Sequence, residues 1–231
     1  MRRETLVEQV AAHLQEMIRA QHLKPGEVLP SEIALARVFG VSKPVVREAM
    51  KSLEGMAIVE MINGKGAVIK SLDNKLLCIF FDRALQLQAG SRLQIIEMRR
   101  GLEIQGAILA AKRRTKEELE RIRDMMIEAR KHQRDLEKHI EFDLQFHLAI
   151  AAATHNPLIQ GVMEALWSSL RGPMREMMQR SMKGRELEAI RKLHEAIFAK
   201  IEKGDAEGAG RMMALHFDEA EKAFDTIGLM T

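Results

Sequence analysis

Hydrophobic residues recur every three or four positions over most of this chain, a spacing typical of amphipathic helices. From about residue 75 onward this period dominates, with few glycine or proline interruptions, and predicts six long helices. Their expected ranges are 92–112, 115–133, 135–153, 157–181, 184–203 and 206–227. The first 70 residues instead combine shorter helical stretches with two strand-like segments. The chain therefore divides near residue 70.

The first 70 residues predict three helices followed by a β-hairpin. Ser31 can cap the second helix, Gly40 suits a tight turn after it, and Ser42 is the expected N-cap of the third helix. Two apolar segments then flank Asn63 and Gly64, a pair that readily takes the positive φ angles of a hairpin turn. This order is that of a winged helix-turn-helix, in which the hairpin is the wing.

The third predicted helix has one basic face. Lys43, Arg47 and Lys51 recur every four residues along it. Such a line can reach into a major groove, with the early residues nearest to the base edges. In an isolated helix it would more often be a solvated charged face, but the turn before it and the hairpin after it favour DNA recognition. Lys65, beside Gly64 at the hairpin tip, is placed to touch the adjacent groove or backbone.

The segment "LPSEIALARVFGVSKPVVREAMKSLEGMAIVEMINGKGAVI" resembles the winged helix-turn-helix of the GntR family of bacterial transcription regulators. The resemblance covers most of residues 5–70 and implies that Lys43, Arg47 and the wing at Gly64 contact operator DNA. Members often have arginine where this chain has Ile33 and Lys43, and lysine cannot make the two-pronged guanine contact of arginine. The candidate DNA-binding residues are Ser42, Lys43, Arg47, Lys51, Gly64 and Lys65.

Composition indicates a globular protein of the cytoplasm. A hydrophobic fraction of 46% in 231 residues is ample for a core. No apolar run approaches the roughly 20 residues that span a bilayer, and the start "MRRETLVEQV" lacks the apolar stretch of a secretory signal. We therefore expect no membrane partner. The net charge of +3 permits a nucleic-acid partner without requiring one. Because Cys78 is the single cysteine, any metal must be held by histidines and carboxylates.

Four polar residues interrupt the apolar stripes of the later helices. Asp143 and His147 lie four residues apart in "EFDLQFHLAI", and His194 and His216 fall on the inward stripes of two further helices. A single such histidine is more often a hydrogen-bonded core residue. Four buried polar groups each need a partner, and one shared divalent metal ion would satisfy them all. The donors suit zinc first, with nickel or manganese as alternatives.

The second part of the chain is similar to the FCD effector domain found in the FadR branch of GntR regulators. Asp143, His147, His194 and His216 match its Asp-x3-His, His, His signature in order, and "EMRRGLEIQGAILAA" matches its first helix. The resemblance implies that these four residues hold a divalent ion, that a small carboxylate effector binds beside it, and that Arg99 meets the carboxylate. Without the family resemblance, a structural ion pair between Arg99 and an internal glutamate explains a buried Arg99 equally well. Asn156 is a further candidate for the effector pocket, although a capping role explains it adequately.

We therefore expect a mainly α protein with a winged helix-turn-helix at residues 1–72, a linker at 73–91 and an all-helical effector- and metal-binding domain at 92–231. The expected function is a homodimeric repressor whose affinity for near-palindromic double-stranded operator DNA is set by a small carboxylate. A metal-dependent enzyme acting on a small organic acid is the first alternative. A purely structural metal, with a separate effector pocket or none, is the second. The complete DNA-reading domain favours sensing over turnover.

Overall fold

The computed structural model describes residues 4–87, 91–181 and 185–225. These residues form two compact units that divide between Leu76 and Leu77, inside the expected linker. The prediction of a mainly helical protein with a small hairpin is confirmed. None of the described helices is both long and apolar enough to cross a membrane.

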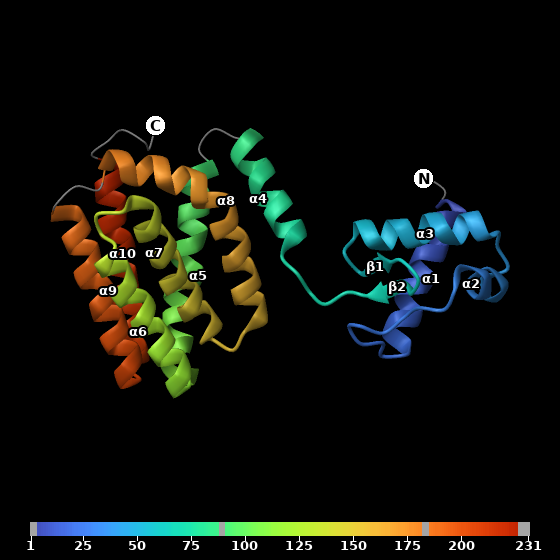
Figure 1. The fold of residues 1–231 in the computed structure, drawn as a ribbon, viewed down its shortest axis with the longest axis horizontal. Coiled ribbons are helices and arrows are strands. Elements are labelled where there is room, and N and C mark those ends of the chain that lie inside the picture. Colours follow the sequence, from blue (N-terminus) through green and yellow to red (C-terminus); the bar gives the residue numbers. More distant parts are fainter. Residues whose placement is uncertain (1–3, 88–90, 182–184, 226–231) are drawn as a thin grey trace. The chain divides into compact units, whose positions relative to one another are not determined.

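The N-terminal unit contains three helices and one antiparallel hairpin (Figure 1). The elements are α1 (Leu6–Ala20), α2 (Glu32–Phe39), α3 (Lys43–Gly55), β1 (Val59–Ile62) and β2 (Gly66–Ile69). Gly40 ends α2 with a φ of 65°, a left-handed conformation that an L side chain rarely adopts. The hairpin pairs Val59 with Ile69 and Ile62 with Gly66. This unit is the winged helix-turn-helix that the sequence predicts.

One apolar core fixes the position of α3 in this unit. Leu14 of α1, Leu35 of α2, and Val46 and Leu53 of α3 are each at most 1% exposed and pack together with Val59 of β1. Apolar residues at helical spacing account for these contacts, because they put one stripe of each helix on the inside. The opposite, basic face of α3 is thereby turned to solvent.

The two predicted serine caps differ in outcome. Oγ of Ser31 accepts a hydrogen bond of 3.2 Å from the N–H of Ala34, as expected for an N-cap. Ser42 occupies the N-cap position of α3, but its side chain makes no capping hydrogen bond, so that part of the prediction is wrong. Pro44, at the start of α3, has no N–H to be capped. The hydroxyl of Ser42 is therefore not engaged by its own helix.

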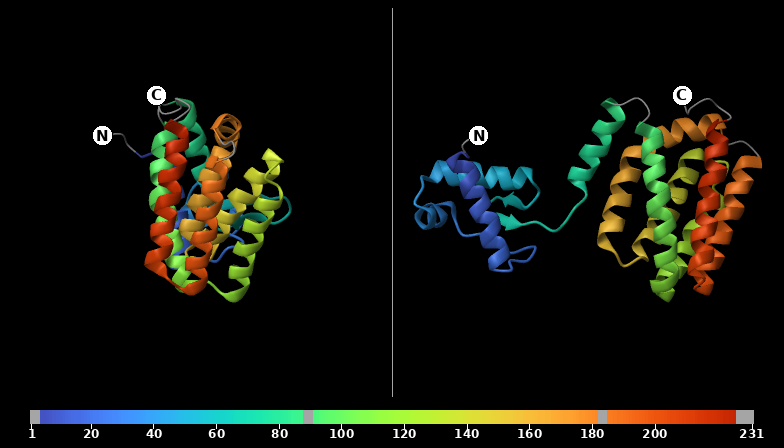
Figure 2. Two further views of the ribbon diagram at one scale, coloured as in Figure 1. Left: turned by 90° about the vertical axis from the view of Figure 1, so that its left-hand side faces the viewer. Right: turned by 180° about the vertical axis from the view of Figure 1, so that it is seen from behind.

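The C-terminal unit is a helical bundle (Figure 1, Figure 2). Its helices are α4 (Lys75–Leu87), α5 (Ser91–Arg113), α6 (Lys116–Lys131), α7 (Leu136–Ala152), α8 (Pro157–Ser181), α9 (Arg185–Lys203) and α10 (Ala206–Asp225). Wherever the chain is described, the ends of the six predicted helices differ from these by at most two residues; 184 and 226–227 lie outside the described residues. Most of the expected linker forms α4.

Helix α7 lies between two apolar clusters of this bundle. Phe146 and Ile150 pack in a cluster with α5, α6, α9 and α10. Leu144 and Ala151 pack in a second cluster that includes Trp167 of α8 and residues of α4 and α5. A helix buried on both sides has little solvated face. The polar residues Asp143 and His147 on α7 are consequently buried as well.

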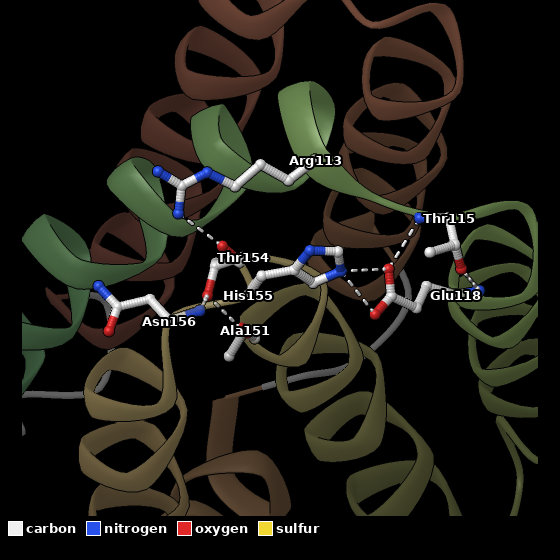
Figure 3. Close-up of polar contacts among 7 residues, drawn as sticks. All are labelled: Arg113, Thr115, Glu118, Ala151, Thr154, His155 and Asn156. Atoms are coloured by element: carbon white, nitrogen blue, oxygen red, sulfur yellow. Dashed lines mark hydrogen bonds and ion pairs between the residues drawn. The ribbon is translucent and has the colours of Figure 1, made fainter.

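A network of polar contacts fixes the turn between α7 and α8 (Figure 3). Thr154 is fully buried; its hydroxyl donates to the carbonyl of Ala151 (2.6 Å) and accepts from the N–H of Asn156 (3.1 Å). Arg113 of α5 donates to the carbonyl of Thr154 (2.8 Å). The side-chain oxygen of Asn156 accepts from the N–H of Leu158 (3.0 Å) at the start of α8. The capping interpretation of Asn156 is thus correct.

Close packing of α10 on α5 depends on Gly210. A Cβ atom at this position would lie 2.8 Å from Cγ1 of Ile108. We therefore expect Gly210→Ala to lower the free energy of unfolding by about 1–3 kcal/mol through overpacking, even after the gain in helix propensity. Urea unfolding followed by circular dichroism measures the change.

Gly101→Ala on α5 is the matched control for Gly210→Ala. Gly101 is exposed and a Cβ there meets no atom within 4 Å. This substitution should raise the free energy of unfolding by about 0.5–1 kcal/mol, because alanine is the better helix former. Equal effects of the two substitutions would contradict the packing explanation.

Candidate DNA-binding and metal-binding sites

The basic face of α3 is accessible along its whole length. The side chains of Lys43, Arg47 and Lys51 are 48%, 52% and 60% exposed. Lys51 pairs with Glu48 on the same helix at 2.9 Å, a solvated contact worth little. The three predicted cations therefore share one open surface.

Glu32 is a partner of this face that the sequence did not identify. It lies in the first turn of α2, and its two carboxylate oxygens accept from Nε (3.2 Å) and Nη2 (3.1 Å) of Arg47. Nζ of Lys43 lies 3.6 Å from the same carboxylate. The hydrogen bonds from Arg47 lower the pKa of Glu32. This two-pronged contact holds the Arg47 guanidinium in one orientation.

The wing and α3 enclose a hollow in the N-terminal unit. Its volume is about 320 Å³, and its lining includes Lys43 on α3, Lys65 at the hairpin tip, and Met50 and Met61. Gly64 and Gly66 flank Lys65 with φ angles of 80° and 92°. Two cations from different elements thus face one concave surface.

Three histidines from three helices meet in the C-terminal unit. His147 of α7, His194 of α9 and His216 of α10 each offer one ring nitrogen, and these nitrogens lie within 4.8 Å of one another. The three side chains are buried, and the ring centroids are 4.6–5.2 Å apart. We call these three residues the histidine cluster. Asp143 lies beside it, with Oδ1 3.5 Å from Nδ1 of His194.

The donor atoms of the histidine cluster fit a divalent metal ion. Nε2 of His147, Nε2 of His194 and Nδ1 of His216 are buried and make no hydrogen bond to the described residues. Burial lowers the pKa of His194 to about 4, despite the attraction of Asp143. Burial, together with the neighbouring histidines, also lowers the pKa of His216 well below its usual value. Both rings are neutral at pH 7, the form that coordinates a metal.

Glu103 of α5 is a buried residue of this region that the sequence analysis missed. Its Oε2 lies 2.6 Å from Nδ1 of His147, without the alignment of a hydrogen bond. Burial alone would raise the pKa of Glu103, but Arg99 and His147 outweigh that effect and lower it to about 2. A signal was available, because Glu103 follows Arg99 by four residues and so shares its helix face.

Arg99 is buried, as its position on the helix predicted, and it forms the internal ion pair that was one of its two interpretations. Its Nε donates to Oε1 of Glu103 (2.9 Å), and its guanidinium carbon lies 3.7 Å from the centroid of the Trp167 ring. These contacts engage Nε and the face of the guanidinium rather than its two terminal nitrogens. The terminal nitrogens remain able to donate to an anion.

Comparison with known proteins defines the class of this chain. The family of bacterial regulatory proteins, gntR family, matches residues 6–69, and the FCD domain family matches residues 94–219. The chain is 35% identical over 207 residues to the HTH-type transcriptional regulator LutR of Bacillus subtilis (strain 168), which covers 89% of this chain and 94% of LutR. It is a bacterial transcription regulator and not an enzyme. It belongs to the GntR family and contains an FCD domain.

Further relatives agree with this assignment. The Uxu operon transcriptional regulator of Escherichia coli (strain K12) is 31% identical over 162 residues, which cover 69% of this chain and 63% of that protein. The solved structure of Streptococcus agalactiae GntR superposes with a TM-score of 0.69 at 23% identity, covering 94% of this chain and 99% of that one. The two proteins share a fold.

Metal removal should lower the stability of the protein. A ligand present at about 100 times its Kd stabilises the folded state by about 2.7 kcal/mol, which raises the melting temperature by roughly 5–10 °C for a chain of this size. We expect Zn²⁺ to produce this rise after chelation and dialysis, as measured by differential scanning fluorimetry. His194→Ala should abolish most of it.

His13→Ala is the matched control for His194→Ala. His13 is an exposed histidine of α1 in the other unit, so its substitution should leave the zinc-dependent rise intact. A rise that survives in His194→Ala, or that is lost in both variants, would contradict a metal site at the histidine cluster.

Proposed function

We propose that this regulator is a repressor whose affinity for a near-palindromic operator is changed by a small carboxylate bound at a metal ion. The observation that carries the proposal is the set of buried ring nitrogens of the histidine cluster that make no hydrogen bond to the described residues, beside the buried Arg99 that Glu103 links to His147. A purely structural explanation of these residues leaves those nitrogens unsatisfied at a cost of about 1–3 kcal/mol each.

The DNA half of the proposal assigns roles along α3 and the wing. Lys43 and Arg47, in the first half of α3, read base edges in the major groove, and Lys51 contacts a phosphate. The hydroxyl of Ser42, which makes no capping hydrogen bond in its own helix, donates to the phosphate backbone of the DNA. Lys65 and the backbone at Gly64 reach the neighbouring groove. Both Lys43 and Lys65 line the hollow between α3 and the wing, so the two cations assigned to DNA share one concave surface.

The metal half of the proposal gives Asp143, His147, His194 and His216 the role of ligands. Zinc is the favoured ion, and nickel and manganese are the alternatives. The bound ion would offer its open coordination positions to carboxylate oxygens. Glu103 contributes by orienting the ring of His147 and by holding Arg99, as carboxylates beside metal-bound histidines commonly do.

The effector of this proposal is a small carboxylate because Arg99, linked to His147 through Glu103, can present its terminal nitrogens to an anion. Its guanidinium is fixed by Glu103 on one edge and by the face of Trp167, which leaves the outer edge to meet an anion in two-pronged geometry. In Arg99→Ala, binding of carboxylates from a screened panel should weaken by roughly 10-fold or more, the weight of one charge-assisted contact. Calorimetric titration of the metal-loaded protein with a carboxylate from that panel measures the loss.

The zinc content of Arg99→Ala shows whether a loss of carboxylate binding comes from the missing effector contact or from damage to the metal site. Arg99→Ala should retain its zinc content after gel filtration, measured by atomic emission, because Arg99 is not a ligand. Arg100→Ala is the control, since Arg100 pairs with Asp218 (2.6 Å) at a half-exposed site on the same helix. If Arg99→Ala bound carboxylates as the unsubstituted protein does, Arg99 would have no effector role.

Dimerisation and the place of action complete the proposal. A homodimer puts two recognition helices on half-sites about 34 Å apart, one turn of DNA. The effector then acts by favouring one of two arrangements of the dimer, which bind the operator with different affinity. Such a regulator works in the cytoplasm, where its operator lies.

Operator recognition should depend on Arg47. We expect Arg47→Ala to reduce affinity by roughly 10- to 100-fold, since a two-pronged base contact is worth about 1–3 kcal/mol. The DNA is selected from a random pool by the unsubstituted protein, and affinity is read from fluorescence anisotropy at fixed salt. Arg19→Ala, which removes an exposed arginine paired with Glu16 on α1, should change affinity less than twofold. Similar losses in both variants would contradict the assigned surface.

A further inference from the structure

A narrow pocket of the C-terminal unit, which we call the channel, lies beside the histidine cluster and contacts His194. It runs between α6, α7 and α9, and its lining includes both Asp143 and His194. Its volume is about 20 Å³, room for roughly one water molecule. Arg130, Gln133 and Arg191 also line it. Two arginines therefore line the pocket that contacts two of the proposed metal ligands.

The two arginines of the channel are held differently. Arg191 of α9 is half-buried and pairs with both Glu188 and Glu195 of its own helix. Arg130 of α6 is 65% exposed, and its Nη1 lies 3.8 Å from Oε1 of Glu195. An exposed contact of that length contributes at most about 1 kcal/mol. The charge of Arg191 is thus balanced by its two glutamates, whereas Arg130 can exchange Glu195 for another anion at little cost.

We propose that this channel is the route by which small anions, carboxylates above all, reach the histidine cluster, and that Arg130 is the anion-collecting cation at its rim. The inference rests on the proposed metal- and carboxylate-binding function. Charges at the mouth of a narrow opening with apolar walls act strongly because the field is focused there. Met126, Ala129 and Ile190 supply such walls. Passage of a carboxylate needs more room than one water, and rotation of the exposed Arg130 and Gln133 side chains provides it.

If the charge of Arg130 controls entry to the channel, reversing it should have opposite effects on the access of a cation and of an anion. Arg130→Glu should speed the access of Ni²⁺ to the metal-free protein. The same substitution should slow the attack of pyridine-2,6-dicarboxylate, a small dianionic chelator, on the nickel-loaded protein. Each change should be about 3- to 10-fold, at the lower end of electrostatic steering. Arg130→Gln should change each rate in the same direction as Arg130→Glu does, but by a smaller factor. A loss of structure would not produce changes of opposite sign.

Trp167 reports both reactions without a label. It is the single tryptophan of the chain, and its ring lies 5.6 Å from that of His147, so a paramagnetic ion at the cluster quenches its emission. Stopped-flow fluorescence of the full-length chain gives the two second-order rate constants. Both should also depend on salt, since the effect is electrostatic: added salt slows the dianion and speeds the cation.

Arg121→Glu is the matched control for charge. Arg121 is exposed on the same helix, nine residues from Arg130 and so roughly 13 Å away along the axis, and the substitution makes the same change in net charge. It should alter either rate by less than about 1.5-fold, because that distance exceeds the screening length. Equal effects of Arg121→Glu and Arg130→Glu would overturn the proposal.

A steric variant tests the route independently of charge. Gln133→Phe adds bulk at the exposed side of the channel and should slow nickel and the dianion alike by about 3-fold or more, within the range seen for restricted access. Unchanged rates in Gln133→Phe, or no dependence of nickel loss on chelator concentration, would overturn the route. Equilibrium nickel affinity is measured in parallel by calorimetry. Absence of both zinc and nickel binding by the unsubstituted protein would refute the proposed function itself, whereas normal affinity with equal rates refutes only the route.

Discussion

Buried imidazole nitrogens without hydrogen-bond partners are the constraint on which the rest of the C-terminal unit depends. Each such atom destabilises the fold by about 1–3 kcal/mol when it is left unsatisfied, and His147, His194 and His216 bring such atoms together from α7, α9 and α10. The proposed metal ion would turn this cost into a gain, because ligand binding stabilises the folded state. The bundle presents closely spaced ring nitrogens that such an ion would bind.

A line of contacts connects the histidine cluster to the helix that follows the DNA-binding unit in sequence. Glu103 lies against His147 and holds Arg99, and Arg99 stacks on Trp167. Trp167 belongs to the same apolar cluster as Phe81 of α4. An anion that meets Arg99 would therefore act on a residue packed against the partners of α4. Contiguous packing of this kind can carry a coupling between the proposed effector site and the DNA-binding unit.

Most of this structure could be predicted from the sequence because hydrophobic residues recur with the period of a helix. The inward positions of Arg99 and the three histidines follow from spacing along one helix. Helix ends and the Gly40 turn follow from the residue types at those positions. Pairings between elements follow from neither. The partnership of Glu32 with Arg47 depends on the angle between α2 and α3, and the approach of Glu103 to His147 depends on how α5 packs against α7. The missing hydrogen bond of Ser42 reflects a local side-chain choice, which residue preference does not determine.

The central claim is that a carboxylate at the metal site changes the affinity for operator DNA. The most direct test measures that affinity with the zinc-loaded, full-length protein, with and without each of a panel of small mono- and dicarboxylates, and repeats it after chelation. The account predicts that at least one carboxylate changes the operator Kd by about 5- to 150-fold, the usual range of allosteric coupling, and that chelation abolishes the change. A carboxylate that binds the zinc-loaded protein but leaves the operator Kd unchanged, or an effect that persists without metal, would contradict it.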